Sequence, residues 1–365
     1  MSSDILPLPP DILAIDTHAD TFARVLDNGF DFLSDDQNLA VSLPRMQRGG
    51  MGAQMFALYV APGMPPGMTF HRAMLMASAG MEAAARSEGR FVFVRNAKDL
   101  EAEWGRGAKC GLLSVEGAHV LEGSLALLHV LDAIGVVSIT LTHANGNEWA
   151  DSSQDRPRWG GLSEGGRKLV REMNRLGMIV DVSHTSDETT AAVLEISSAP
   201  VIASHSGCHA LCNHPRNLPD SLIREIAARG GIVQIPYYPP FLDQKASDVF
   251  SVNWDRLRGQ ESKDAPPDDP EYMARLYARC MQDVPPVPLD AVCAHIDHVV
   301  SLVGTEHVGL GSDWDGADVT VRGLESCDLL GQLAHMLPAR GYKQKDVGAI
   351  LGGNFIRVLR EVTGA

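Results

Sequence analysis

The sequence predicts an α/β protein that folds as a (β/α)8 barrel of the TIM type. Strand-like and helical segments alternate along the whole chain. Six apolar segments also stop abruptly on His, Asp or Glu: LAIDTHAD (13–20), GLLSVEG (111–117), VSITLTH (137–143), MIVDVSH (178–184), VIASHS (201–206) and VGLGSD (308–313). Short apolar runs bounded by turn signals are typical of buried strands. A barrel gathers the residues that follow its strands at one mouth, so these endings predict a shared site there.

The individual elements support a closed barrel. We expect eight strands at 13–16, 53–60, 111–115, three runs ending at His143, His184 and His205, then 231–236 and 308–312. Helical patterns follow them at 71–87, 124–134, 164–176, 187–196, 221–229, 289–303 and 324–337. Eight alternations without a block of strands alone favour a parallel barrel. Glycines before several strands, as in RLGMIV, ARGGIV and LVGTEHVGL, are expected to end the preceding helices.

Residues 1–365 are expected to form one barrel domain, since barrels of this class often exceed 250 residues. A long segment, 237–288, separates the last two strands and contains KDAPPDDPEY and DVPPVP. We expect it to fold over the site as a lid. A surface insertion without function is the alternative. The Pro/Gly loop at 61–68 is expected at the same mouth.

Composition excludes several classes of partner. Lys and Arg number 31 against 46 Asp and Glu, a net charge of −15, so nucleic acid is not an expected partner. The first residues lack the pattern of a secretion signal, and no run reaches the roughly 18 apolar residues of a membrane helix. Six irregularly spaced cysteines favour reduced thiols over a disulfide framework. We therefore expect a cytoplasmic protein without a membrane partner.

Five residues at the strand ends form a candidate metal centre. His18 and Asp20 are two residues apart, which on a strand places both side chains on one face. Glu116 follows an apolar strand, where an unpaired carboxylate would be costly. His184 and His205 end consecutive strands. Each residue alone is more often structural, but together they predict a binuclear centre for divalent ions, with zinc as the expected metal.

The bridging ligand of this centre is expected to be Glu116. Many binuclear barrel hydrolases use a carboxylated lysine instead, but no lysine ends an expected strand: Lys98, Lys109, Lys168, Lys245, Lys263, Lys343 and Lys345 fall in loops, in helices or before a strand. We expect two Zn²⁺ ions bridged by Glu116 and by a water or hydroxide. A structural zinc site at Cys208, Cys212 and His214 is a competing interpretation, although it lacks paired CxxC elements.

Three further residues are candidates for catalysis or substrate binding. Asp313, in GLGSDWDG, could act as general base and acid, or could simply cap a turn. His143, in LTHANGNEWAD, could stabilise a tetrahedral oxyanion. Arg216, in NHPRNLPD, could bind a carboxylate through two hydrogen bonds or could pair with Asp220.

These motifs resemble the membrane (renal) dipeptidase family of zinc peptidases, peptidase family M19, among the amidohydrolase-like barrels. The likeness runs from about residue 16 to 357 and is carried by DTHAD, SVEGAH, LTHANGNEWADS, VDVSHTS, SHSGCHALCNHPRNLPD, GLGSDWDG and GGNFIRV. Their shared order makes the likeness specific. DTHAD stands where the family usually has DGHND, and both candidate ligands are kept. The signal, disulfide cysteines and lipid anchor of the animal members are not found, so the membrane part of the name is not carried over.

The resemblance implies a role for each candidate residue. His18 and Asp20 would bind one zinc, His184 and His205 the other, and Glu116 both. The roles of the remaining residues would be proton transfer for Asp313, contact with the scissile carbonyl or its oxyanion for His143, binding of the substrate carboxylate for Arg216, and lining of the pocket for Tyr238.

We therefore expect a zinc-dependent dipeptidase that uses a metal-bridging hydroxide. Family members accept D-residues at the second position, so L,D-dipeptides such as L-Ala-D-Ala are expected substrates. One alternative is another amide hydrolase on the same centre, an N-acyl-amino-acid deacylase or a lactamase-like enzyme. A second is an inert barrel that binds metal or peptide. Whether the chain forms a homodimer is left open by its sequence.

Overall fold

Eight parallel strands form a nearly closed barrel, as the sequence predicts. The computed structural model describes residues 5–65, 67–260, 270–317 and 319–364. The strands follow the order β1-β2-β4-β5-β6-β7-β8-β9. Their bounds are β1 (Ile15–Ala19), β2 (Ala53–Tyr59), β4 (Lys109–Glu116), β5 (Val136–Thr140), β6 (Ile179–Asp181), β7 (Ile202–Ala203), β8 (Ile232–Ile235) and β9 (Val308–Leu310). The ring is joined after β9, where the Asp313 amide donates to the His18 carbonyl at 3.1 Å.

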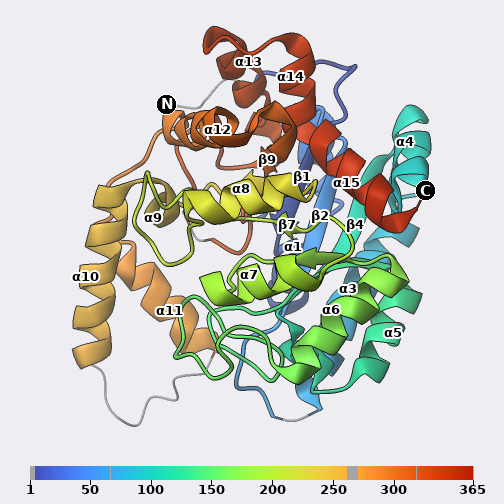
Figure 1. Ribbon diagram of the computed structural model, residues 1–365. Helices are drawn as coiled ribbons and strands as arrows, with labels where there is room; N and C mark the ends of the chain where they lie inside the picture. Colours follow the sequence, from blue (N-terminus) through green and yellow to red (C-terminus); the bar gives the residue numbers. More distant parts are fainter. Residues whose placement is uncertain (1–4, 66, 261–269, 318, 365) are drawn as a thin grey trace.

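Helices surround this barrel (Figure 1). They are α1 (Thr21–Asn28), α2 (Leu43–Gly49), α3 (Met68–Arg86), α4 (Ala97–Gly105), α5 (Leu125–Ile134), α6 (Glu164–Leu176), α7 (Asp187–Ile196), α8 (Asp220–Ala228), α12 (Asp290–Val303), α13 (Gly331–Ala339), α14 (Gln344–Gly348) and α15 (Asn354–Thr363). Local sequence fixes many of their ends. In α6, the Ser163 hydroxyl accepts from the Gly166 amide at the start, and Gly177 ends the helix at φ 72°. Gly304 likewise ends α12, so the expected role is confirmed at these two glycines. In ARGGIV the C-cap of α8 is Arg229 instead, directly before Gly230.

Several expected elements differ in the structure. A short strand, β3 (Phe91–Phe93), pairs with β4 outside the barrel order and was not expected. The strands expected to end on three histidines stop earlier, at Thr140, Asp181 and Ala203, so the histidines lie in the turns that follow. The helix expected over 324–337 is interrupted. Cys327–Leu329 forms a 3-10 turn, and α13 begins at Gly331.

The segment 237–288 is helical where a long loop was expected. It contains α9 (Pro239–Leu242), α10 (Gln244–Gln260) and α11 (Pro270–Cys280), while residues 261–269 lie outside the described part of the chain. Figure 1 shows α10 and α11 at one side of the barrel. These helices share an apolar cluster that includes Tyr238, Phe241, Phe250, Leu276 and Met281. Their amphipathic pattern is therefore satisfied by packing on one another.

The amino-terminal end of the barrel is closed by apolar packing. Side chains near the starts of the strands cluster with α15, through Ile15, Ile179, Ile202, Ile232 and Phe355. This cluster fills the amino-terminal end of the barrel, whereas Glu116, the last residue of β4, lies at the carboxyl end, where barrels of this type place their sites. No helix in the described part of the chain combines the length and apolarity that crossing a bilayer requires.

Gly311, just after β9, allows two strand ends to approach closely. A Cβ atom there would lie 1.6 Å from the Ser204 carbonyl oxygen and 3.1 Å from Thr17 Oγ1. Because backbone cannot move aside cheaply, Gly311→Ala is expected to lower the free energy of unfolding by about 3 kcal/mol. Urea unfolding followed by circular dichroism measures this. Gly105→Ala is the control, since a Cβ at Gly105 meets nothing within 4 Å. Equal stability of the two variants would contradict the packing described here.

Candidate metal centre

Glu116, the last residue of β4, lies at the centre of a group of histidines. Its Oε1 is 3.0 Å from His184 Nε2, 3.3 Å from His18 Nε2 and 3.4 Å from His205 Nε2. All four side chains are buried. They come from four different strand ends, so the barrel itself brings them together.

Two aspartates complete the group on the side of His18. His18 Nε2 is 3.7 Å from Asp20 Oδ2 and 4.0 Å from Asp313 Oδ1. Asp20 stands at the start of α1, yet its side chain makes no capping hydrogen bond there. Its carboxylate is turned toward the histidines instead. The structure thus brings together all five residues predicted as ligands.

Left-handed backbone at two positions directs side chains into this cluster. His184 and Asp313 both have φ of 66°, a conformation that costs about 1 kcal/mol or more for residues other than glycine. His184 is held there by its carbonyl, which accepts from the Ser153 amide at 2.8 Å. At His184 this turn also explains why β6 stops before the histidine. A straight strand would not present the His184 ring to Glu116.

The electrostatics of the cluster favour added positive charge. Burial raises the pKa of Asp20 well above its usual range, and the neighbouring Glu116 carboxylate adds to this. Burial alone would lower the pKa of His18, but Glu116, Asp20 and Asp313 together raise it to about 10. Burial works against the Glu116 carboxylate as well, yet His18 and His143 hold its pKa well below the ordinary value. The three neighbouring carboxylates of Asp20, Glu116 and Asp313 therefore favour the binding of a cation.

Buried atoms without partners show that the residues fit a metal. In the described residues these include His18 Nε2, Asp20 Oδ1, His143 Nδ1 and His184 Nδ1. Three sets of donor atoms lie within 4.8 Å of one another: His18, Glu116 and His205; Glu116, His143 and His184; and His18, Asp20 and Asp313. Imidazole nitrogens with carboxylate oxygens suit zinc and related divalent ions. Glu116 belongs to two sets, as a bridging ligand would.

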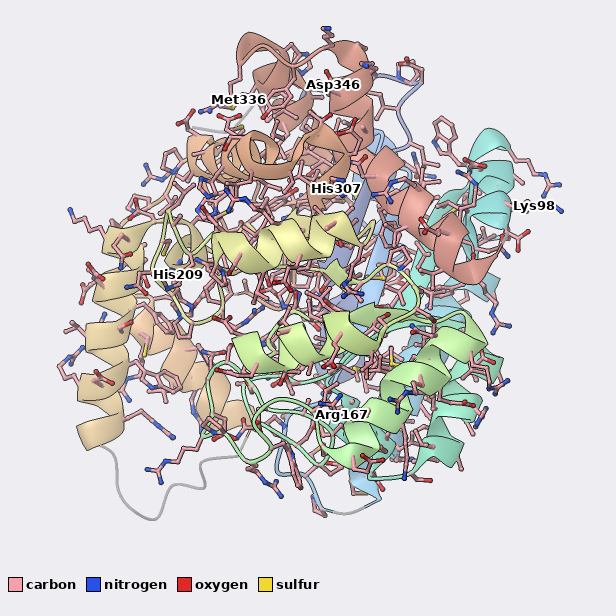
Figure 2. The ribbon with its side chains drawn as sticks, viewed as in Figure 1. Lys98, Arg167, His209, His307, Met336 and Asp346 are labelled. Carbon is pink, nitrogen blue, oxygen red and sulfur yellow. The ribbon has the colours of Figure 1, made fainter. Side chains whose placement is uncertain are left out.

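Lys98 and Lys109 lie away from this cluster. Lys98 extends outward from α4 in Figure 2. Lys109 is the first residue of β4, at the end opposite Glu116, rather than preceding the strand as expected. The described clusters of potential ligands contain no cysteine either. Lys263 lies outside the described residues.

His143 lies at the edge of the cluster, where its side chain is 21% exposed. Its Nε2 is 4.0 Å from Glu116 Oε1, and its ring packs on His184 and on Tyr59, with centroids 4.4 Å and 4.7 Å apart. Burial lowers the pKa of His143 to about 4. A neutral imidazole at this edge can donate one hydrogen bond to a bound molecule.

Arg216 is buried beside the cluster without a matching carboxylate. Its guanidinium donates to the His205 carbonyl at 3.0 Å and to Ser206 Oγ at 3.4 Å, and its Nε has no partner among the described residues. The ring of Phe241 lies 5.2 Å from the guanidinium carbon. The alternative pairing with Asp220 is not found, because Asp220 contacts His298 at 2.8 Å. A buried guanidinium of this kind is suited to bind an anion.

Comparison with known sequences identifies the family. The sequence profile of the membrane dipeptidase family, peptidase family M19, matches residues 4–365. The chain belongs to this family. It is a hydrolase acting on peptide bonds, a dipeptidase of the M19 metallopeptidases, as its motifs predict.

Relatives of this M19 chain agree in sequence and in fold. It is 34% identical to the dipeptidase aclJ of Aspergillus oryzae over 88% of this chain and 70% of that protein. The crystal structure of the probable dipeptidase PvdM from Pseudomonas aeruginosa superimposes with a TM-score of 0.86 at 26% identity, covering 97% and 96% of the two chains. The metallopeptidase dipeptidase AC gives a TM-score of 0.79 at 26% identity, covering 99% and 100%.

Tyr238 lies among the aromatic residues of the M19 chain's insertion rather than beside the histidines. Its hydroxyl is 3.4 Å from Met281 Sδ, and its ring meets Phe241 edge-on at 4.9 Å. Phe241 in turn packs under Arg216. The structure therefore connects Tyr238 to the predicted substrate-binding residue through one intervening ring.

The competing zinc site at two cysteines is not supported. Cys208 Sγ lies 3.6 Å from the His295 carbonyl, and Cys212 Sγ lies 3.4 Å from the Pro240 carbonyl. Burial raises the pKa of both thiols. They behave as buried structural residues of this M19 peptidase.

Two residues of the M19 site were missed by the sequence analysis. Tyr59 ends β2 and packs on His143, and it would have been found by applying the strand-end rule to this strand too. Gly316, in GLGSDWDG, approaches two carboxylates. A Cβ atom there would lie 2.1 Å from Asp20 Oδ2 and 2.8 Å from Asp313 Oδ1. No local signal separates this glycine from an ordinary turn glycine.

Gly316→Ala is expected to push the Asp20 carboxylate out of the cluster. Displacing a supporting group typically costs ~10- to 100-fold in metal affinity, and we expect a loss of this size for zinc. Competition with a chromophoric chelator measures it. The Gly105→Ala protein, altered in a helix far from the strand ends, should bind zinc like the parent. Unchanged affinity in Gly316→Ala would show that Asp20 does not hold the metal.

Proposed function

We propose that this chain is a zinc-dependent dipeptidase whose two ions are held by His18, Asp20, Glu116, His184 and His205. The observation that carries the proposal is the position of Glu116 Oε1, between 3.0 and 3.4 Å from three imidazole nitrogens. Such a pair of divalent ions would supply a hydroxide at neutral pH and would polarise the peptide carbonyl.

Asp313 is proposed to carry the proton between the attacking water and the departing amine. Its side chain is 19% exposed, against 4% for Glu116, so a substrate can reach it. Burial raises the pKa of Asp313 to about 7, with the Glu116 carboxylate adding to the effect. Bound cations would lower this pKa, so Asp313 would be ionised at neutral pH in the loaded enzyme, able to accept the proton of the attacking water and then pass it to the amine. His143, neutral at this pH, is proposed to donate to the oxyanion.

Arg216 is proposed to bind the carboxylate of the substrate. It lies against the backbone of His205, so a bound carboxylate would be held at a fixed distance from the metal ligands. This geometry would select substrates with a free carboxylate one residue beyond the cleaved bond. The described helices α9, α10 and α11 are proposed to form a lid on this side, because Phe241 of α9 contacts Arg216.

Comparing three compounds on zinc-reconstituted protein tests this function. L-Ala-D-Ala is expected to be hydrolysed at least about tenfold faster than N-acetyl-D-alanine, which keeps the carboxylate but lacks the amine. L-Ala-D-alaninamide, which lacks the carboxylate, is expected to lose a similar factor. Faster turnover of N-acetyl-D-alanine would favour a deacylase instead. No turnover of any of these compounds or of a wider dipeptide set would favour an inert barrel.

A further inference from the structure

Behind His205, the side chains of Ser204 and Asp181 form a short hydrogen-bonded chain. Ser204 Oγ is 2.8 Å from His205 Nδ1 and 2.5 Å from Asp181 Oδ2. All three residues are buried, with exposed fractions of 1% or less. We propose that Asp181 and Ser204 are positioning residues that fix the His205 ring in the form whose Nε2 lone pair faces Glu116. This inference rests on the metal centre proposed above and explains how one ligand is prepared for it.

Counting protons along the chain sets the direction of each hydrogen bond. Asp181 Oδ1 accepts from the backbone amides of Ser183 and Ser204, at 2.9 and 3.0 Å. Asp181 Oδ2 accepts from the hydroxyls of Thr140 and Ser204, at 2.6 and 2.5 Å. A serine hydroxyl has one proton, and here it is directed to Asp181. Ser204 Oγ must then accept from His205 Nδ1–H, which leaves Nε2 without a proton.

The remaining polar groups of His205 are also fixed. Its backbone amide donates to Ser183 Oγ at 3.0 Å, and its carbonyl accepts from Arg216 at 3.0 Å. His184 and His143 differ, because their Nδ1 atoms are buried without a partner among the described residues. His205 is therefore a preset ligand. His184 Nε2 lies 2.8 Å from His205 Nε2, and because the proton count leaves His205 Nε2 as the acceptor, His184 donates this hydrogen bond in the metal-free protein. Supporting groups of this kind typically change metal affinity by ~10- to 100-fold.

Two substitutions test this hydrogen-bonded chain, because one breaks it and the other reverses the direction of its hydrogen bonds. Ser204→Ala removes the hydrogen bond to Nδ1 and leaves both ring forms of His205 accessible. Asp181→Asn reverses the chain, because the two backbone amides retain the Asn oxygen at the Oδ1 position and the amide nitrogen then donates to Ser204. The Ser204 hydroxyl would donate to His205 Nδ1, and the ring proton would move to Nε2, where it blocks a metal. Asp181→Asn is therefore expected to harm binding more than Ser204→Ala, although asparagine is the closer replacement in shape.

Zinc titration of the full-length protein in competition with a chelator, with nitrogen NMR of its histidines after metal removal, tests the proposal. We expect one of two zinc equivalents to weaken ~10-fold in Ser204→Ala and ~100-fold in Asp181→Asn. Ser138→Ala is the matched control, since Ser138 Oγ is buried on β5 and donates to the Ile179 carbonyl at 3.2 Å. NMR of the parent should show His205 protonated on Nδ1, and NMR of Asp181→Asn should show it protonated on Nε2.

The outcomes separate this inference from the proposed function. If the parent binds two zinc ions and both variants bind them as tightly, the positioning role is wrong while the metal centre stands. If the parent binds none, the proposed function fails, and the ring form of His205 is still read by NMR. If either variant does not fold, the parent spectrum decides: a proton on Nε2 of His205 would overturn the inference.

Discussion

Glu116→Gln is expected to remove tight binding of both metal ions and to abolish dipeptide hydrolysis. Glu116 Oε1 lies 3.3 Å from His18 Nε2, 3.0 Å from His184 Nε2 and 3.4 Å from His205 Nε2. Glutamine keeps the shape but loses the charge, and its amide nitrogen would face a ring nitrogen that a metal requires. Loss of a group that only supports a metal ligand typically lowers metal affinity ~10- to 100-fold. Loss of the ligand Glu116 itself should therefore lower zinc affinity by more than about 100-fold. Metal analysis after dialysis and a dipeptide assay measure the two effects.

A second glutamate beyond β4 provides the control for this change. Glu122 accepts from Thr69 Oγ1 at 2.6 Å and from the Gly67 amide at 3.1 Å, and it does not contact the histidines. Glu122→Gln should therefore lose some stability while keeping metal and activity. A Glu116→Gln protein that retained two tightly bound ions and normal turnover would show that Glu116 is not the bridge.

Asp313→Asn is expected to keep the metal and lose turnover by ~10²- to 10⁴-fold, the usual value of a positioned proton donor and acceptor. Asp313 Oδ1 is 4.0 Å from His18 Nε2, which is farther than any of the Glu116 contacts with the three ligand histidines. An amide at this position can hold a hydrogen bond but cannot carry a proton. The expected loss is in kcat, with KM nearly unchanged, as steady-state assays at several dipeptide concentrations would show.

Asp315→Asn is the matched control for Asp313. Asp315 is buried and accepts from Thr21 Oγ1 at 2.6 Å and from the Ala40 amide at 2.7 Å, so its role is structural. Its replacement should lower stability but leave kcat per folded molecule unchanged. If Asp313→Asn were as active as Asp315→Asn, another group would have to transfer the proton.

The strand-end pattern predicted the barrel and the clustering of the five candidate ligands for a physical reason. Parallel strands of a barrel end at one mouth, so a polar residue after each apolar run reaches the same space. The pattern overestimated the strands before His143, His184 and His205, because it cannot show that a turn intervenes. At His184 this turn requires a left-handed backbone, and the residues around His184 give no sequence signal for it.

Contacts between distant segments were beyond the reach of the sequence. The chain from Asp181 through Ser204 to His205 joins two strand ends, and each of its residues looks locally like an ordinary turn residue. Gly316 likewise matters only because Asp20, from the other end of the sequence, packs against it. In 237–288, proline- and aspartate-rich stretches suggested a loop and obscured α10 and α11, whose stability comes from packing on one another.

Metal stoichiometry tests the central claim most directly. Protein stripped with a chelator and then titrated with zinc should bind two equivalents per chain, and dipeptidase activity should return in step with that binding. Replacement of His18 should lower the number of zinc ions bound per chain, and replacement of His184 should do the same. Binding of no stoichiometric metal, or full activity in the stripped protein, would contradict the account.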